Sequence, residues 1–151
     1  MVLHQDYKEL LRLLNDNQVE YIVIGAFALG FHGAPRNTGD IDIWIRISKE
    51  NAKRMIATLE VFGFSSLGYK KEDFFEKDSI IQLGVPPVRI DIFTSITGVE
   101  FEDAYNNRCI LKSDEISINY LSKEDFIKNK KSLGRLKDLA DVERISQIAE
   151  L

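Results

Sequence analysis

The sequence has a single cysteine and no long apolar run, and each scarcity excludes a class of protein. Its single cysteine, Cys109, cannot form an intramolecular disulfide, which is typical of a reducing compartment. No apolar stretch approaches the roughly 18 residues of a membrane-spanning helix. The first residues lack the basic start and apolar run of a signal peptide. We therefore expect a cytoplasmic protein that does not bind through a membrane segment.

Two common catalytic patterns are also missing. The sequence has no Gly-x-x-x-x-Gly-Lys-Ser/Thr motif, which argues against the nucleoside-triphosphate hydrolases built on that loop. Its two histidines suggest neither a Ser/His/Asp arrangement nor a histidine metal site. The function has to be sought in the carboxylates and the basic residues.

The composition is that of a globular domain. Of the 151 residues, 44% are hydrophobic and 29% are charged, which is unlike a disordered chain. A chain of this length buries roughly 68–70% of the surface that it exposes when unfolded. We expect one domain, with a core at residues 1–121 and a helical C-terminal segment at residues 122–151 that packs on it.

The charge is unevenly distributed along the chain. The net charge of −4 argues against a strong general affinity for nucleic acid. Between residues 123 and 137, however, six side chains are basic and two are acidic. This segment is either a solvated helix face or a surface that faces a triphosphate or an RNA backbone.

The most informative pattern is a buried strand and turn followed by two aspartates. Residues 21–24 predict a strand that ends at Gly25, and residues 40–47 carry isoleucine at every second position. Because strand side chains alternate between faces, Asp40 and Asp42 point together, away from the isoleucines. Close carboxylates repel unless a cation or hydrogen-bond donors offset their charge. Magnesium takes a few carboxylate oxygens together with water and phosphates, so the pattern suggests phosphoryl transfer.

A third acid follows in a second alternating strand. In residues 88–93, Arg89, Asp91 and Phe93 share one face and two isoleucines the other. If this strand is a neighbour of the first, three carboxylates converge at one site. The alternative for the first two aspartates is a pair of exposed strand acids. The position of Asp91 favours the site, where it would hold a second metal or accept the proton of an attacking hydroxyl.

The rest of the chain predicts helices and short strands around this pair. Apolar spacing, caps and breakers indicate helices at 6–15, after Gly25, at 51–62, 100–106, from 122, and at 136–151. They indicate further strands at 64–67, 80–85, 109–111 and 116–118.

These residues resemble the nucleotidyltransferases of the DNA polymerase beta superfamily. The signature of that family is a strand, a Gly-Gly or Gly-Ser turn, an Asp-x-Asp strand and a later single Asp, here spread over residues 21–93. The chain is more similar still to a small bacterial branch of minimal nucleotidyltransferases and abortive-infection type toxins. In that branch an Arg-x-Thr precedes the aspartates, here Arg36 to Thr38. A lysine and Gly-Arg-x-Lys-Asp-x-x-Asp follow later, here Lys130 and residues 134–141.

The resemblance implies a fold, a reaction and a set of roles. The fold is α/β, with a mixed sheet flanked by helices and a short helical C-terminal part. The reaction moves a nucleoside monophosphate from a nucleoside triphosphate (NTP) to an acceptor hydroxyl, with Mg²⁺ or Mn²⁺ and release of pyrophosphate. The acceptor is left open between transfer RNA, a partner protein of a toxin–antitoxin pair and a small molecule such as an aminoglycoside. The oligomeric state is also left open.

The roles fall on two blocks of the sequence. Asp40, Asp42 and Asp91 are the implied metal ligands and catalytic residues, and Lys130 is a further catalytic residue. The implied nucleotide contacts are Gly25, Ala26, Arg36, Thr38, Arg135 and Lys137. Asp138 and Asp141, which share a side of a helix, would orient the basic side chains. For each basic residue, plain surface solvation is the alternative.

One position departs from the family pattern. The second turn residue is usually Gly or Ser, and here it is Ala26, so a hydroxyl that could hold phosphate is missing. Backbone N–H groups at the start of a helix can still bind an anion. The departure leaves a second hypothesis, in which the protein is a non-catalytic binding module or toxin–antitoxin component with the same fold.

Overall fold

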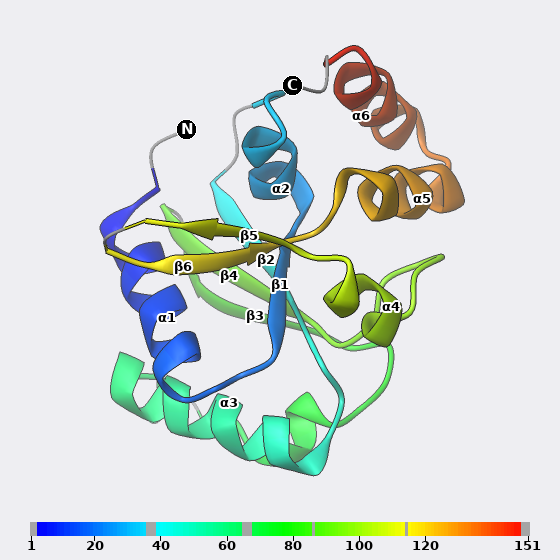
Figure 1. Ribbon diagram of the computed structural model, residues 1–151. Helices are drawn as coiled ribbons and strands as arrows, with labels where there is room; N and C mark the ends of the chain where they lie inside the picture. The colour runs from blue at the N-terminus through cyan, green and yellow to red at the C-terminus, as the bar shows by residue number, and fades with distance from the viewer. Residues whose placement is uncertain (1–2, 36–38, 65–67, 86, 114, 149–151) are drawn as a thin grey trace.

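The computed structural model describes residues 3–35, 39–64, 68–85, 87–113 and 115–148. The strands of these residues form a six-stranded mixed sheet in the order β3-β4-β2-β1-β6-β5 (Figure 1). The elements in chain order are α1 (Gln5–Asp16), β1 (Tyr21–Ile24), α2 (Gly25–Phe31), β2 (Asp40–Ile45), α3 (Lys49–Phe62), η2 (Lys71–Phe74), β3 (Ile80–Val85), β4 (Val88–Phe93), α4 (Phe101–Asn106), β5 (Cys109–Lys112), β6 (Ser117–Tyr120), α5 (Lys123–Leu133) and α6 (Leu136–Ser146).

The sheet combines two antiparallel hairpins with parallel pairs at its centre. Strands β3 and β4 form one hairpin, and β5 and β6 the other. At the centre β2 runs parallel to β4 and antiparallel to β1, while β1 runs parallel to β6. This mixed α/β architecture confirms the predicted fold class. It also makes β2 and β4 direct neighbours, as the convergence of the acids requires.

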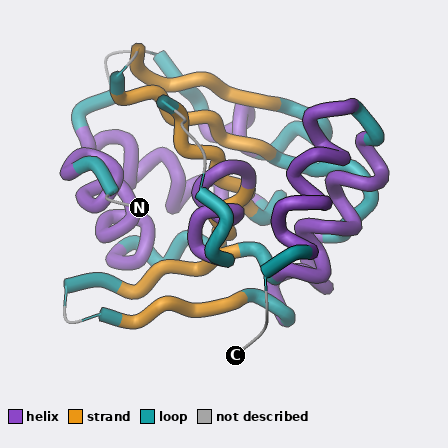
Figure 2. Tube along the Cα trace, turned by 90° about the horizontal axis from the view of Figure 1, so that it is seen from above, coloured by secondary structure: helices purple, strands orange, loops and turns teal. Residues whose placement is uncertain are grey.

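The core lies against the inner strands. Every residue of β1 is buried, and the isoleucines of β2 and β4 have no exposed surface. The apolar stripe of α1 packs against them, and α1 and α3 lie on the opposite side of the molecule from the α5–α6 pair (Figures 1 and 2). Burial of these side chains stabilises the fold by about 25 cal/mol for each Å² of apolar surface removed from water.

The caps predicted from the sequence fix the ends of two long helices. The Ser48 hydroxyl accepts from the Asn51 amide at the start of α3, and the Ser122 hydroxyl accepts from the Asp125 amide at the start of α5. Gly63 and Gly134 end these helices in the left-handed conformation, which glycine adopts at little cost.

Several predicted boundaries were wrong. Strand β2 ends at Ile45 rather than residue 47, because the next carbonyl, of Arg46, accepts from the Asn51 side chain at 2.9 Å and the chain turns into α3. The 116–118 strand is displaced to Ser117–Tyr120, and α6 ends at Ser146. In the expected 64–67 strand, Phe64 is not in a strand and residues 65–67 lie outside the described residues.

Candidate functional site

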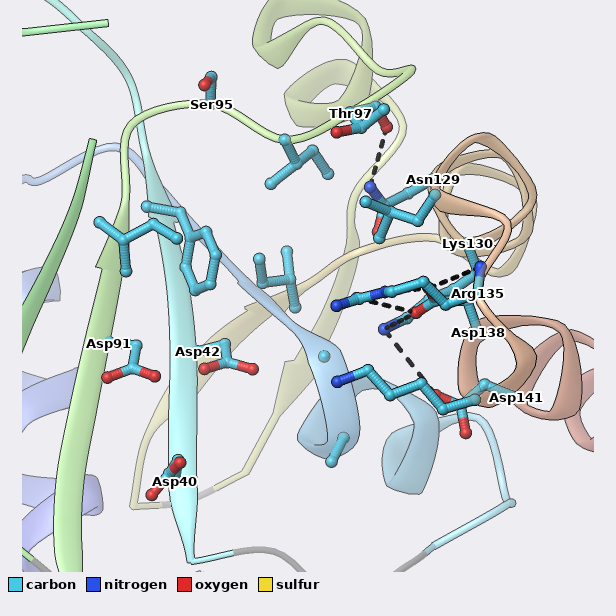
Figure 3. Close-up of a pocket in the computed structure, with 18 of the residues that line it drawn as sticks. Asp40, Asp42, Asp91, Ser95, Thr97, Asn129, Lys130, Arg135, Asp138 and Asp141 are labelled. Atoms are coloured by element: carbon cyan, nitrogen blue, oxygen red, sulfur yellow. Dashed lines mark hydrogen bonds and ion pairs between the residues drawn. The ribbon is translucent and has the colours of Figure 1, made fainter. Parts of the chain in front are cut away.

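The three aspartates lie on one face of the two central parallel strands. In the register of β2 and β4, Asp40 is paired with Arg89 and Asp42 with Asp91. Paired residues of adjacent strands present their side chains on the same face. Figure 3 shows the three carboxylates directed toward a common space. The alternation seen in the sequence therefore has a direct structural counterpart.

Gly25 fixes the turn that approaches these acids. Its φ of +65° lies in the left-handed region, which L side chains rarely adopt. A Cβ at this position would collide with Oδ2 of Asp42 and come within 3.2 Å of its Cγ. The glycine thus lets the backbone after β1 lie directly against a carboxylate. The next residue, Ala26, is buried in α2 and also lines the cavity.

Arg89 is a cation on the acid face. Its Nε lies 3.1 Å from Asp91 Oδ1 and its Nη2 lies 3.3 Å from Asp91 Oδ2, which makes a two-point fork. The same Nε lies 3.8 Å from Asp40 Oδ2. The hydrogen bonds and charge of Asp91 raise the pKa of Arg89 further above its ordinary value. The guanidinium therefore offsets part of the repulsion among the three acids.

Tyr7 bridges the backbones of the two segments that carry the acids. Its hydroxyl lies 2.7 Å from the Gly39 carbonyl oxygen and 2.9 Å from the Arg89 carbonyl oxygen, so its proton is shared between segments that flank the acids. Burial, followed by the charges of Asp40 and its neighbours, raises the pKa of Tyr7. The neutral, donating form is thus maintained well above neutral pH.

The acids line one wall of a cavity of about 690 Å³. Helices α5 and α6 form the facing wall, which carries Lys130 and Arg135 (Figure 3). Lys137 of α6 also lines the cavity. The loop after β4 closes a third side, where the Asn129 side chain donates to the Thr97 carbonyl at 2.8 Å. One cavity therefore joins the two sequence blocks that carried the predicted site.

Four charged side chains on the helical wall form ion pairs with one another. Lys130 Nζ lies 3.5 Å from Asp138 Oδ1 and 3.8 Å from Asp141 Oδ2. Arg135 Nε donates to Asp138 Oδ2 at 2.6 Å, and the Arg135 amide donates to the same oxygen at 3.2 Å. Asp138 and Asp141 are buried, as their shared side of α6 requires. The two acids hold the two basic side chains in place.

The electrostatics of this group follow from its hydrogen bonds. The bond from Arg135, helped by the charge of Lys130, lowers the pKa of Asp138 although burial acts in the other direction. Two cations and two carboxylates leave the group without net charge. Lys137 is exposed at the cavity, and among the described residues it has no ion-pair partner. It is thus the surplus positive charge of this wall.

The site residues Arg36 and Thr38 lie outside the described residues, so nothing is added to their prediction. The described residues also include no group of three or more His, Cys, Asp or Glu side chains already arranged to hold a metal ion. The donor chemistry nevertheless fits a hard divalent ion, because three carboxylates share one face and Mg²⁺ takes oxygen ligands. At present Arg89 contacts two of these carboxylates.

Residues 2–151 match a family described as nucleotidyltransferases of unknown function (DUF6036), and the chain belongs to that family. This confirms the resemblance seen in the sequence. A comparison with curated proteins finds no match. No helix in the described part of the chain is long and apolar enough to cross a membrane.

Three solved structures share the fold. A candidate nucleotidyltransferase (TM1012) from Thermotoga maritima is 21% identical, with a TM-score of 0.58 over 94% of this chain and 93% of that one. The lincosamide antibiotic adenylyltransferase LnuA, solved with lincomycin, is 18% identical, with a TM-score of 0.54 over 98% and 99%. An antigenic nucleotidyltransferase-like protein from Paracoccidioides brasiliensis is 19% identical, with a TM-score of 0.52 over 97% and 78%. At these identities the likeness concerns the fold alone.

Sequence reasoning gave no role to three residues that shape the site. Arg89 was placed on the acid face, but its partner could not be read from alternation. Tyr7 falls within the helix expected at 6–15, and nothing local shows that its hydroxyl reaches backbone far along the chain. Asn129 lies inside a basic run, and no pattern in the sequence marks its burial in α5.

Proposed function

We propose that this protein is a metal-dependent nucleotidyltransferase that moves a nucleoside monophosphate from an NTP to an acceptor hydroxyl. The observation that carries the proposal is one cavity with three carboxylates from two neighbouring strands on one wall and three basic side chains on the other. Such opposed walls match a substrate that combines a polyphosphate with a divalent cation. Membership of a nucleotidyltransferase family supports the same reading.

The reaction assigns each wall a task. The acceptor oxygen forms a bond to the α-phosphorus, the bond from that phosphorus to the bridging oxygen breaks, and pyrophosphate leaves. Asp91 takes the proton of the acceptor hydroxyl. Asp40 and Asp42, with Asp91, would hold Mg²⁺ or Mn²⁺, which supplies charge neutralisation to the triphosphate when bound.

The helical wall stabilises negative charge as pyrophosphate departs. Lys137 is the free surface cation for this task, and Lys130 and Arg135 contribute from positions fixed by Asp138 and Asp141. Preorganised donors of this kind are worth about 10²–10³ in rate each. Gly25 and Ala26 bring backbone close to the phosphates, and Arg36 and Thr38 complete the nucleotide contacts in this proposal.

The acceptor classes remain RNA, a protein side chain and a small molecule. The fold neighbour LnuA is a lincosamide adenylyltransferase, so a small hydroxyl compound belongs in the test. A cytoplasmic toxin–antitoxin role belongs with the RNA and protein acceptors. We expect no transfer to a membrane component.

The experiment incubates the protein with each of the four α-labelled NTPs and Mg²⁺ or Mn²⁺. The acceptors are total cell RNA, cell protein and a panel of hydroxyl antibiotics that includes lincosamides and aminoglycosides. Asp42→Asn is the inactive comparison, and Asp16→Asn, an exposed acid at the end of α1, is the matched control. We expect label on one acceptor class with wild type and Asp16→Asn only. Absence of label on all three classes would favour the non-catalytic binding module.

A further inference from the structure

The charges of the acid face are partly balanced from within. Asp40, Asp42, Arg89 and Asp91 form two adjacent cross-strand pairs on one face. Among the described residues, the Arg89 guanidinium lies beside two of these carboxylates, those of Asp91 and Asp40. Any metal that enters therefore meets this positive charge.

Arg89 and a metal ion compete for the same carboxylate. Both oxygens of Asp91 accept from Arg89, at 3.1 and 3.3 Å. Each oxygen keeps a second lone pair, but a guanidinium at this distance places positive charge beside any cation that uses it. Like charges this close repel one another. Metal binding is thus favoured when the fork opens.

The Arg89 side chain can move away from Asp91 while the backbone of β4 stays in place. The Arg89 carbonyl accepts from Tyr7, which holds the backbone of β4. The Arg89 side chain is 32% exposed, and among the described residues its charged partners are Asp91 and Asp40. Swinging the guanidinium toward the cavity would break these contacts and leave the sheet unchanged.

We propose that Arg89 is a positioning residue that substitutes for the metal in the nucleotide-free protein and releases Asp91 when metal and triphosphate enter. The proposal rests on the proposed function of this site. Arg89 offsets the charge of Asp91 and lies beside Asp40 before the metal enters. Once released, it faces a substrate that carries the opposite charge. The empty site is stabilised at the expense of metal affinity.

The test measures Mn²⁺ affinity by calorimetry, and melting temperature in chelator, for wild type and Arg89→Gln. We expect Arg89→Gln to bind Mn²⁺ on the order of tenfold more tightly and to melt lower in chelator, because Asp91 then loses the guanidinium that donates to both of its oxygens. Arg54→Gln is the matched control, since Arg54 pairs with Glu50 on α3 and is 33% exposed. It should leave Mn²⁺ affinity unchanged. If the Arg89–Asp91 pair served only to hold the site in shape, its loss would instead weaken Mn²⁺ binding.

Two further variants keep the result interpretable. Arg89→Lys retains the charge but loses the fork, and we expect intermediate affinity; it replaces Arg89→Gln if circular dichroism shows that the latter is unfolded. Arg89→Gln/Asp91→Asn should lose the gain in affinity. Equal or weaker Mn²⁺ binding by both single variants overturns the proposal. Transfer is scored separately, so wild type that binds Mn²⁺ but labels no acceptor would refute the proposed function and leave the role of Arg89 standing.

Discussion

Gly25 is the residue whose replacement separates the backbone geometry of the site from its charges. It combines a positive φ with direct approach to the Asp42 carboxylate. Gly63 has a φ of +100° but no atom within 4 Å of an added Cβ. An alanine at either position would therefore adopt a strained backbone conformation, but only an alanine at position 25 would also collide with a side chain.

We expect Gly25→Ala and Gly63→Ala each to lower the free energy of unfolding by about 1 kcal/mol through strain, and Gly25→Ala to lower it further. Only Gly25→Ala should also abolish the rise in melting temperature with NTP and Mg²⁺, because the displaced Asp42 no longer faces the cavity. Denaturant unfolding and thermal melts measure both effects. Retention of the full nucleotide-dependent rise in Gly25→Ala would show that the turn does not shape the site.

Asp138 makes a pH-dependent contribution to stability. Its pKa in the folded protein is lowered by the hydrogen bond from Arg135, so the stabilisation is fully present above the unfolded-state pKa of about 4 and is lost as the pH falls through the folded-state pKa. Asp138→Asn should cost about 2 kcal/mol at neutral pH and less at about pH 3. Urea unfolding at both values measures this, with Asp16→Asn as control. A cost that does not shrink in acid would contradict the assignment.

At the scale of elements, α5 and α6 are joined by buried ion pairs and also form one wall of the site. Lys130 lies between two buried acids, so its removal takes a cation away from both, and breaking such a buried pair costs about 3 kcal/mol. Loss of activity in Lys130→Ala would therefore mix instability with catalysis. Lys137, exposed on the same wall, does not carry this complication.

We expect Lys137→Ala to slow labelled-nucleotide transfer by about 10²-fold with no change in the free energy of unfolding. Lys131→Ala is the matched control, since Lys131 is exposed on α5 and lies outside the cavity lining. Transfer rates and unfolding curves are compared for the two variants. Equal transfer rates for the two variants would show that Lys137 is a solvated surface residue with no part in transfer.

For the whole molecule, sequence reasoning reached the fold and the acid face but not the internal contacts of the site. Alternation sufficed for Asp40, Asp42 and Asp91, because the opposite face had to enter the core. It could not show that Arg89 forks onto Asp91, since an arginine on that face can equally extend into solvent. The shared helix side of Asp138 and Asp141 suggested that they orient basic side chains, but it could not single out Lys130 as the one held between them, because helix packing across a turn decides which face is buried.

The central claim is that the three carboxylates and the helical wall form one nucleotide-and-metal site. Calorimetry with an NTP and Mg²⁺ tests it most directly, on wild type, Asp42→Asn, Asp91→Asn and the control Asp16→Asn. We predict a single binding event in wild type and Asp16→Asn that is lost in both site variants. Absence of binding at millimolar nucleotide in wild type, or equal binding by Asp42→Asn, would contradict the claim.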